Sequence, residues 1–231
     1  MQHSSAPPHI RRVTVYASSS NALAASYYDA AARLGTVLGS AGLDIVYGGG
    51  GVGLMRAMAD HALAAGAHVH GVIPHFLNTV EHGHQNLSRL EVVADMRERK
   101  HRMIADSHAV VSLPGGSGTF EELFEVLTLK RLGLFLGPVV LVNTNAYFNR
   151  FVEFLQHSVR ERFMAEPHLG MWSLAAEREA RLYAAMREMG LPLPVEPAAM
   201  SAEQLERIRD VGGMIAATFI DFEHFIIPDE I

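Results

Sequence analysis

The chain has 231 residues, and 49% of them are hydrophobic, which is enough for one α/β domain over residues 1–231. The formal net charge of -6 argues against nucleic acid as a partner, so we expect any bound phosphate to belong to a small ligand. The lack of cysteine excludes disulfides, thiolate metal sites and a cysteine nucleophile. Residues 1–10 lack the apolar core of a secretory signal, and the longest apolar runs are far shorter than a bilayer span, so we expect a cytoplasmic protein without membrane contact.

Short apolar runs alternate with helical periodicity along most of the chain. Continuous apolar strands that alternate with helices predict a parallel sheet covered on both faces, the doubly wound, Rossmann-like α/β fold. After residue 147 we expect chiefly helical structure with proline breaks. In chain order we predict strand 13–17, helix 24–40, strand 43–47, helix 52–65, strand 68–73, loop 78–89, strand 90–93, helix 96–106, strand 109–113, helix 119–132 and strand 139–142.

Three loops of small residues follow predicted strands, at the sheet edge where such folds bind ligands, so we expect them to meet in one crevice. Glycine lets the backbone approach a phosphate, and a helix N-terminus supplies unpaired N–H groups. The loop at 114–119 therefore predicts an anion site, with a purely structural turn as the alternative. It offers Gly115, Gly116, Ser117, Gly118 and Thr119 as binding residues.

The other two loops are candidate ligand contacts through Ser19 in the first and through Gly49 and Gly50 in the second. The glycines of the second loop have the alternative of serving only helix-to-strand packing. Neither glycine loop matches a P-loop or the G-x-G-x-x-G pattern, which argues against a nucleotide triphosphatase.

Charged residues lie close to the loop at 114–119. Glu121 and Glu122 are predicted in the opening turn of the following helix, where they complement the helix dipole or, beside a bound phosphate, bind ribose hydroxyls or activate water. The run from Arg97 to Arg102 is a solvated helix face or places Arg99 or Lys100 at the ligand, and we favour the ligand. Histidines between residues 68 and 84 fit no standard ligand spacing, so no metal is expected.

Three strings, YGGGGVGLM (47–55), MRERK (96–100) and PGGSGTFEE (114–122), together resemble the Lonely Guy family of cytokinin riboside 5′-monophosphate phosphoribohydrolases. The similarity covers about residues 12–175 and includes SSSN (18–21) and GVIP (71–74). Similar sequences also carry the name lysine decarboxylase. That name fits poorly, because pyridoxal phosphate chemistry needs a Schiff-base lysine and the chain has only Lys100 and Lys130.

The resemblance implies an adenine-type nucleoside 5′-monophosphate as substrate, free base and ribose 5-phosphate as products, and no metal or redox cofactor. It places the catalytic pair on Arg99 and Glu122 and implies a homodimer or larger homo-oligomer. The nucleotide would be bound by Glu81, Lys100, Gly116, Ser117, Gly118, Thr119 and Thr128.

Three features depart from relatives. Ser117 stands where an aromatic residue is common, and residues 129–131 are more basic than usual, which leaves the preferred base open. The third is a C-terminal extension at about 176–231, read as helical, which would pack on the subunit, extend an interface or cover the crevice.

A non-catalytic nucleotide or cofactor carrier and a nucleotide-responsive regulatory protein are the alternative functions.

Overall fold

The computed structural model describes residues 10–80 and 83–175, which build a parallel seven-stranded sheet of order β4-β3-β2-β1-β5-β6-β7. The elements are β1 (Arg12–Tyr16), α1 (Ala25–Ser40), β2 (Asp44–Tyr47), α2 (Gly53–Ala64), β3 (Val69–Pro74), α3 (His75–Val80), β4 (Arg89–Val93), α4 (Met96–Ile104), β5 (Ala109–Ser112), α5 (Ser117–Arg131), β6 (Val139–Val142), the 3-10 helix η1 (Thr144–Ala146), α6 (Asn149–Arg160), the 3-10 helix η2 (Glu166–Met171) and β7 (Ser173–Ala175).

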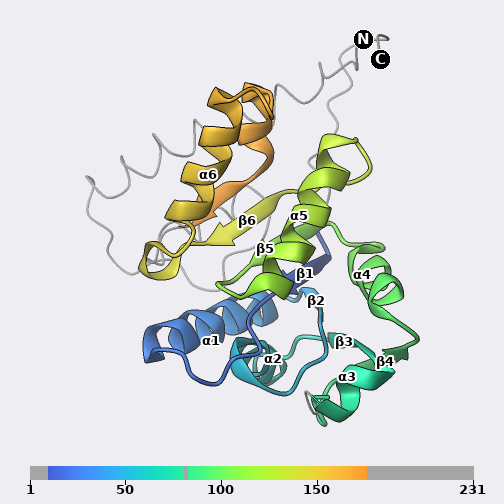
Figure 1. The fold of residues 1–231 in the computed structure, drawn as a ribbon. Helices are drawn as coiled ribbons and strands as arrows, with labels where there is room; N and C mark the ends of the chain where they lie inside the picture. Colours follow the sequence, from blue (N-terminus) through green and yellow to red (C-terminus); the bar gives the residue numbers. More distant parts are fainter. Residues whose placement is uncertain (1–9, 81–82, 176–231) are drawn as a thin grey trace, which may run out of the picture.

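Alternate residues of the strands supply two separate cores, one on each face of the sheet. In β1, Val13 and Val15 join the core under α1 and α2, whereas Tyr16 joins the core under α5 and α6. Figure 1 shows α1 and α2 together on one side of the strands and α5 and α6 on the other. The predicted doubly wound fold with helices on both faces is therefore confirmed.

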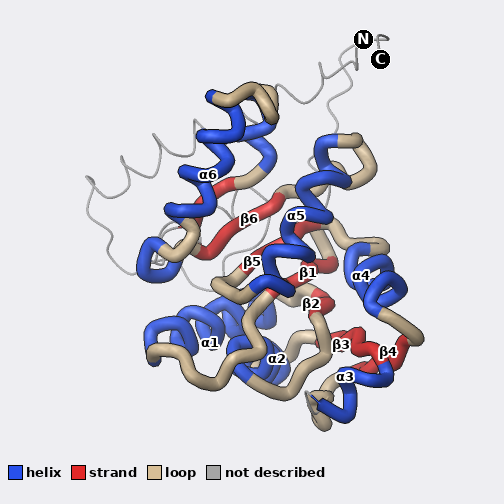
Figure 2. Tube along the Cα trace, viewed as in Figure 1, coloured by secondary structure: helices blue, strands red, loops and turns tan. Residues whose placement is uncertain are grey.

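The strand order reverses beside β1, which pairs with β2 on one side and with β5 on the other. Tyr16 at the end of β1 lies opposite Ser112 at the end of β5. The loops that follow these two strands therefore leave the sheet side by side, at the switch point where open α/β sheets bind ligands. Figure 2 shows these loops between the strands and the helices that follow them.

Several predicted boundaries differ from the structure. Residues 78–80 belong to α3, so this part of the predicted loop is wrong; the glycines and most of the polar residues behind that prediction come after the helix. Helix α5 begins at Ser117, two residues earlier than predicted, and α4 ends at Ile104, two residues earlier than predicted. Strand β7 was not predicted, because three residues at a sheet edge are too few for periodicity. The C-terminal extension lies outside the described residues.

Within residues 10–80 and 83–175, no helix combines the length and hydrophobicity that a membrane crossing requires.

Two glycines let α1 approach α2 closely. A Cβ at Gly35 would lie 2.2 Å from the carbonyl oxygen of Met58, and one at Gly39 would lie 2.7 Å from the Cβ of Ala65. Both values are shorter than van der Waals contact, and the first involves backbone, which cannot move away without shifting α2. The layer that supports the first two ligand loops thus depends on these glycines.

Gly35→Ala is expected to destabilise the protein by about 1–3 kcal/mol, because overpacking between the helices outweighs the gain in helix propensity. Urea denaturation measures this change. Thr36→Ala, one residue along on the exposed face of α1, is the matched control and is expected to leave the free energy of unfolding almost unchanged. Equal stabilities for the two variants would contradict the close contact.

Candidate active site

The Arg99 guanidinium is the best-anchored charged group at the carboxyl ends of the strands. Its Nε donates to the carbonyl of Val72 at 3.1 Å, and its Nη2 donates to the carbonyl of Gly48 at 3.1 Å. The residue is only 7% exposed although it lies in the charged run of α4. A Cβ at Gly48 would lie 1.9 Å from Nη2, so this glycine makes room for the guanidinium. The solvated-face interpretation is therefore wrong for Arg99.

Glu122 of α5 is the ionic partner of Arg99. Its Oε1 lies 3.4 Å from Arg99 Nη1, and Glu122 is 8% exposed. Buried charges are stable only when paired, so the two side chains fix one another. Burial and then the Glu122 carboxylate raise the pKa of Tyr16 far above its ordinary value, which places a neutral phenol beside the pair. Tyr16 is a site neighbour that the sequence analysis missed, because an aromatic residue ending a strand reads as core.

Glu121 and Glu122 do not complement the dipole of α5 as opening-turn residues. Because the helix begins at Ser117, they fall in its second turn, and its first turn holds no acidic residue. The prediction that placed them in the opening turn is wrong. Their other suggested task, at a bound ligand, is compatible with this position.

Lys100 lies next to Arg99 on α4 and forms a second bridge to α5. Its Nζ pairs with Glu121 and lies 2.8 Å from Oε2 of Glu125. Hydrogen bonds to both carboxylates raise the pKa of Lys100, so the group stays an ammonium ion at neutral pH. Glu121 and Glu125 are partly exposed, which leaves this pair open to a ligand at the surface.

The loop between β5 and α5 has the form of an anion site. Gly116 is the N-cap and, being glycine, supplies no side chain to the first-turn N–H groups. Gly116, Ser117 and Gly118 are exposed, whereas Gly115 and Thr119 are buried. A Cβ at Gly115 would lie 2.1 Å from Oγ1 of Thr119, so glycine is required there.

Backbone groups in and directly after the second glycine loop form hydrogen bonds with other parts of the protein. The N–H groups of Leu54 and Met55 at the start of α2 donate to the carbonyl of Ser18, at 2.9 and 3.3 Å. Gly49 and Gly50 are buried, and the Gly49 carbonyl accepts from the N–H of His84 at 3.0 Å. These contacts support the packing alternative for this loop, and ligand contact by Gly49 and Gly50 stays a prediction.

The structure brings most predicted site residues together, with two exceptions. Arg99, Lys100, Glu121 and Glu122 meet where α4 lies beside α5, and Ser19 is exposed on the loop next to that of β5. Thr128 lies nine residues beyond Thr119, about 13 Å along α5, and its hydroxyl donates to the carbonyl of Phe124. The structure does not describe Glu81.

Two of the histidines lie beside carboxylates. His84 Nε2 lies 2.8 Å from Oδ1 of Asp60, and His70 Nε2 lies 3.1 Å from Oε2 of Glu91. Burial, with a contribution from Arg89, lowers the pKa of His70. Among the residues that the structure describes, no group of three or more His, Asp or Glu side chains is arranged to hold a metal ion.

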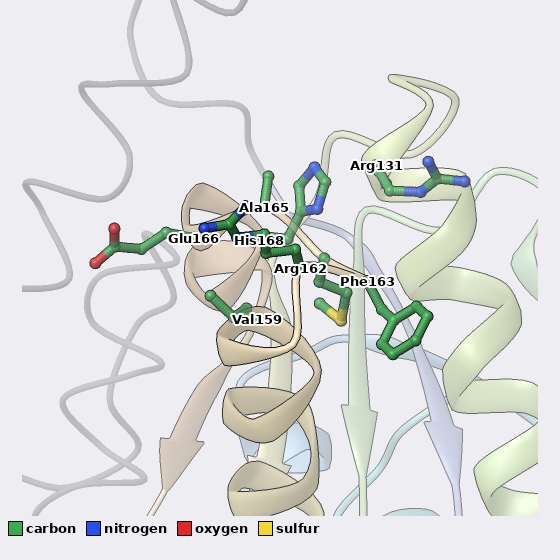
Figure 3. Close-up of a pocket in the computed structure, with 8 residues that line it drawn as sticks. Arg131, Val159, Arg162, Phe163, Ala165, Glu166 and His168 are labelled. Atoms are coloured by element: carbon green, nitrogen blue, oxygen red, sulfur yellow. The ribbon is translucent and has the colours of Figure 1, made fainter.

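A cavity of about 700 Å³ lies at the opposite end of α5 from the glycine loop (Figure 3). Arg131, Arg162, Phe163 and His168 are among its lining residues. Arg131 is the last residue of α5, twelve residues and about 18 Å beyond Thr119. The cavity is thus separate from the loops at the switch point.

Comparison with known proteins gives the family. Residues 55–186 match the family model described as "Possible lysine decarboxylase". Cytokinin riboside 5′-monophosphate phosphoribohydrolase LOG1 of Arabidopsis thaliana is 42% identical over 155 residues, which is 67% of this chain and 73% of that protein. The enzyme LOG of Oryza sativa subsp. japonica, which has the same descriptive name, is 42% identical over 156 residues, 68% of this chain and 64% of that protein.

Solved structures share the fold at lower identity. The molybdenum cofactor carrier protein of Chlamydomonas reinhardtii superposes with a TM-score of 0.58 and 20% identity, over 78% of this chain and 98% of that chain. The molybdenum cofactor binding protein of Rippkaea orientalis gives a TM-score of 0.54 and 16% identity, over 88% and 98% of the two chains. At these identities the likeness establishes the fold alone.

A parallel sheet with a glycine loop after β5 and a buried Arg–Glu pair between α4 and α5 defines a Rossmann-like α/β protein. Within that class, the chain belongs to the Lonely Guy family, the family of the plant phosphoribohydrolases to which it is similar. The resemblance drawn from the three sequence strings is confirmed.

The two lysines do not fit the decarboxylase name. Lys100 is held as an ammonium ion by two carboxylates, whereas a Schiff base requires a neutral amine. Lys130 is buried near the far end of α5, where its Nζ donates to the carbonyl of Gly137 at 2.8 Å.

Lys130 makes the stability of the fold depend on pH. Burial lowers its pKa to about 8 from 10.5, so between these values the unfolded chain binds more protons than the native chain. The Lys130 contribution to the free energy of unfolding is therefore expected to rise with pH as the native amine loses its proton, by about 1 kcal/mol between pH 7 and 9. Urea denaturation of the wild type and of Lys130→Met at pH 7 and at pH 9 measures this contribution. An identical pH dependence in the two proteins would contradict this assignment.

Proposed function

We propose that the protein hydrolyses the N-glycosidic bond of adenosine 5′-monophosphates, including N6-substituted ones, to a free base and ribose 5-phosphate. The observation that carries this proposal is the buried pair of Arg99 and Glu122, 3.4 Å apart, beside the glycine loop of α5. The names of relatives at about 42% identity support the same reaction.

Glu122 is suited to the charge that this reaction develops. As the bond from C1′ to the base breaks, its electron pair leaves with the base and positive charge builds on the ribose ring. A buried carboxylate stabilises this charge and orients the water whose oxygen bonds to C1′. The water loses one proton as its oxygen bonds to C1′, and the departing base gains one proton, so the products are the neutral base and ribose 5-phosphate.

Arg99 keeps the Glu122 carboxylate in place and supplies positive charge near the leaving group, which is the base. Its Nε and Nη2 are used by backbone carbonyls, so Nη1 is the group directed at Glu122. The guanidinium cannot lose a proton at neutral pH, so it acts by hydrogen bonding and charge, holding the phosphate or assisting the departing base.

The 5′-phosphate would be bound by the exposed start of α5 and by Lys100. Gly116, Ser117 and Gly118 offer backbone N–H groups, and Ser117 adds a hydroxyl. Lys100 pairs with Glu121 of α5, so the ammonium ion lies beside the second turn of the helix that begins at this loop. The rest of the proposed nucleotide-binding set consists of Ser19, Gly49, Gly50, Glu81, Gly115, Thr119, Glu121 and Thr128.

Glu122→Gln keeps the size of the side chain and removes its charge. We expect it to lower kcat/KM for base release by roughly 100-fold or more, because a group that stabilises developing charge is typically worth this much. Chromatography of the free base from AMP and from a prenylated AMP measures the rate and ranks the two bases.

Glu153→Gln is the matched control, because Glu153 is an exposed residue of α6 that pairs with Arg150. It is expected to keep wild-type activity. Binding of AMP by wild type without release of base from either nucleotide would refute the hydrolase proposal in favour of a carrier or regulatory protein on the same fold.

We infer that the protein is at least a homodimer and that the joined α5–α6 face forms the interface. Phe124 of α5 contacts Phe151 of α6 with ring centroids 5.5 Å apart, and Phe124 and Phe154 are 41% and 56% exposed. Exposed apolar side chains in one area are typical of subunit contacts.

Phe124→Glu combined with Phe154→Glu is expected to yield a monomer in sedimentation velocity, because it places two charges in the interface. Thr36→Glu, on the exposed side of α1, is the control and is expected to sediment like wild type. A wild-type protein that sediments as a 25.3 kDa monomer at micromolar concentration would refute the interface.

A further inference from the structure

The peptide group that joins Gly115 to Gly116 has two possible faces for a ligand. In a planar trans peptide the carbonyl oxygen and the following N–H point in opposite directions. Rotation of this one plane would therefore exchange a donor for an acceptor at the start of α5. An acceptor that faces a bound phosphate repels it, whereas a donor attracts it.

Little in the loop itself fixes this plane. Both residues are glycine, which accepts backbone conformations that other residues avoid, and Gly116 is exposed. A Cβ built at Gly116 would meet no atom within 4 Å among the described residues, so no neighbouring group packs against the Cα there. Packing thus constrains Gly115, which is buried against Thr119, but not Gly116, and the contact that bears directly on the plane is a hydrogen bond to the Gly115 carbonyl.

Tyr147 supplies that hydrogen bond. Its hydroxyl donates to the carbonyl oxygen of Gly115 at 2.6 Å. The carbonyl thus faces Tyr147, and the N–H of Gly116 faces away from it. Burial raises the pKa of Tyr147, so the phenol keeps the proton that it donates.

The backbone before Tyr147 is held in an uncommon conformation. Asn145 and Ala146 have φ values of 53° and 58°, in the left-handed region that favours glycine. The Asn145 amide donates to Oγ of Ser26 at 2.9 Å, which ties the turn to α1. Such a conformation persists where surrounding contacts require it, and here it directs the Tyr147 ring toward α5.

Aromatic contacts fix the ring. Tyr147 stacks on Phe120 of α5 with centroids 6.3 Å apart and planes inclined by 18°. Tyr27 and Phe148 contact it edge-on, at 6.3 and 5.3 Å. Phe120 belongs to α5, whose N-cap is Gly116. The Tyr147 ring and the Tyr147 hydroxyl therefore both contact the start of α5.

We propose that Tyr147 is a positioning residue that locks the Gly115–Gly116 peptide in the donor-presenting orientation and thereby creates the affinity for the 5′-phosphate. The proposal rests on the proposed function, because it takes the glycine loop as the phosphate site. It assigns Tyr147 no contact with the reacting atoms.

Tyr147→Phe removes the hydroxyl and keeps the ring. In the Glu122→Gln background, which spares the nucleotide, isothermal titration calorimetry with AMP is expected to show about five- to tenfold weaker binding, the range for one lost hydrogen bond. Binding of adenosine, which has no phosphate, is expected to stay unchanged. A loss confined to the phosphorylated ligand is the result that a merely structural role would not give.

Tyr27→Phe is the matched control, since it removes the same atom from the neighbouring ring and is expected to leave the ratio of AMP to adenosine affinity as in the parent. Unchanged AMP binding by Tyr147→Phe, or equal weakening of AMP and adenosine, would overturn the proposal. Base release by the otherwise wild-type enzyme is scored separately, so a protein that binds AMP without cleaving it would refute the hydrolase function and still test Tyr147.

Discussion

A buried guanidinium is the constraint on which the site depends. Arg99 is held by the carbonyls of Val72 and Gly48 and by the Glu122 carboxylate, so it joins α4 to β3, to the loop after β2 and to α5. A charge at this depth is tolerated only when all three contacts are present together. The proposed catalytic pair is therefore oriented by the fold itself, and preorganised charge of this kind is what lowers reaction barriers in enzymes.

The parallel sheet explains why distant segments can meet at this guanidinium. Loops after β1, β2 and β5 leave the same edge, and the strand order places those of β1 and β5 at the switch point. One face of the sheet carries α1 and α2, whose close packing relies on Gly35. The other face carries α5, whose N-terminus and second turn supply the proposed phosphate loop and Glu122.

Much of this arrangement could be predicted from sequence. Apolar runs predicted the strands up to β6, and glycine loops after strands predicted the sheet edge at which Arg99 and Glu122 meet. The burial of Arg99 could not be predicted from the sequence, because a run of charged residues has the same pattern whether a side chain faces solvent or binds backbone carbonyls. The role of Tyr147 could not be predicted for a related reason. Its partner, Gly115, is 32 residues away, and a backbone carbonyl acceptor cannot be recognised from the pattern of side chains. The short strand β7 and the start of α5 were missed because local periodicity does not resolve element ends.

Gly48 and Arg99 contact one another although they lie 51 residues apart in the chain. Since a Cβ there would come within 1.9 Å of Arg99 Nη2, a larger residue at position 48 is compatible only with a shorter one at position 99. Over evolutionary time the two positions are therefore expected to change together or not at all. A lineage that abandoned the arginine would be released from the glycine, so the pair distinguishes members that retain this site from members that keep only the fold.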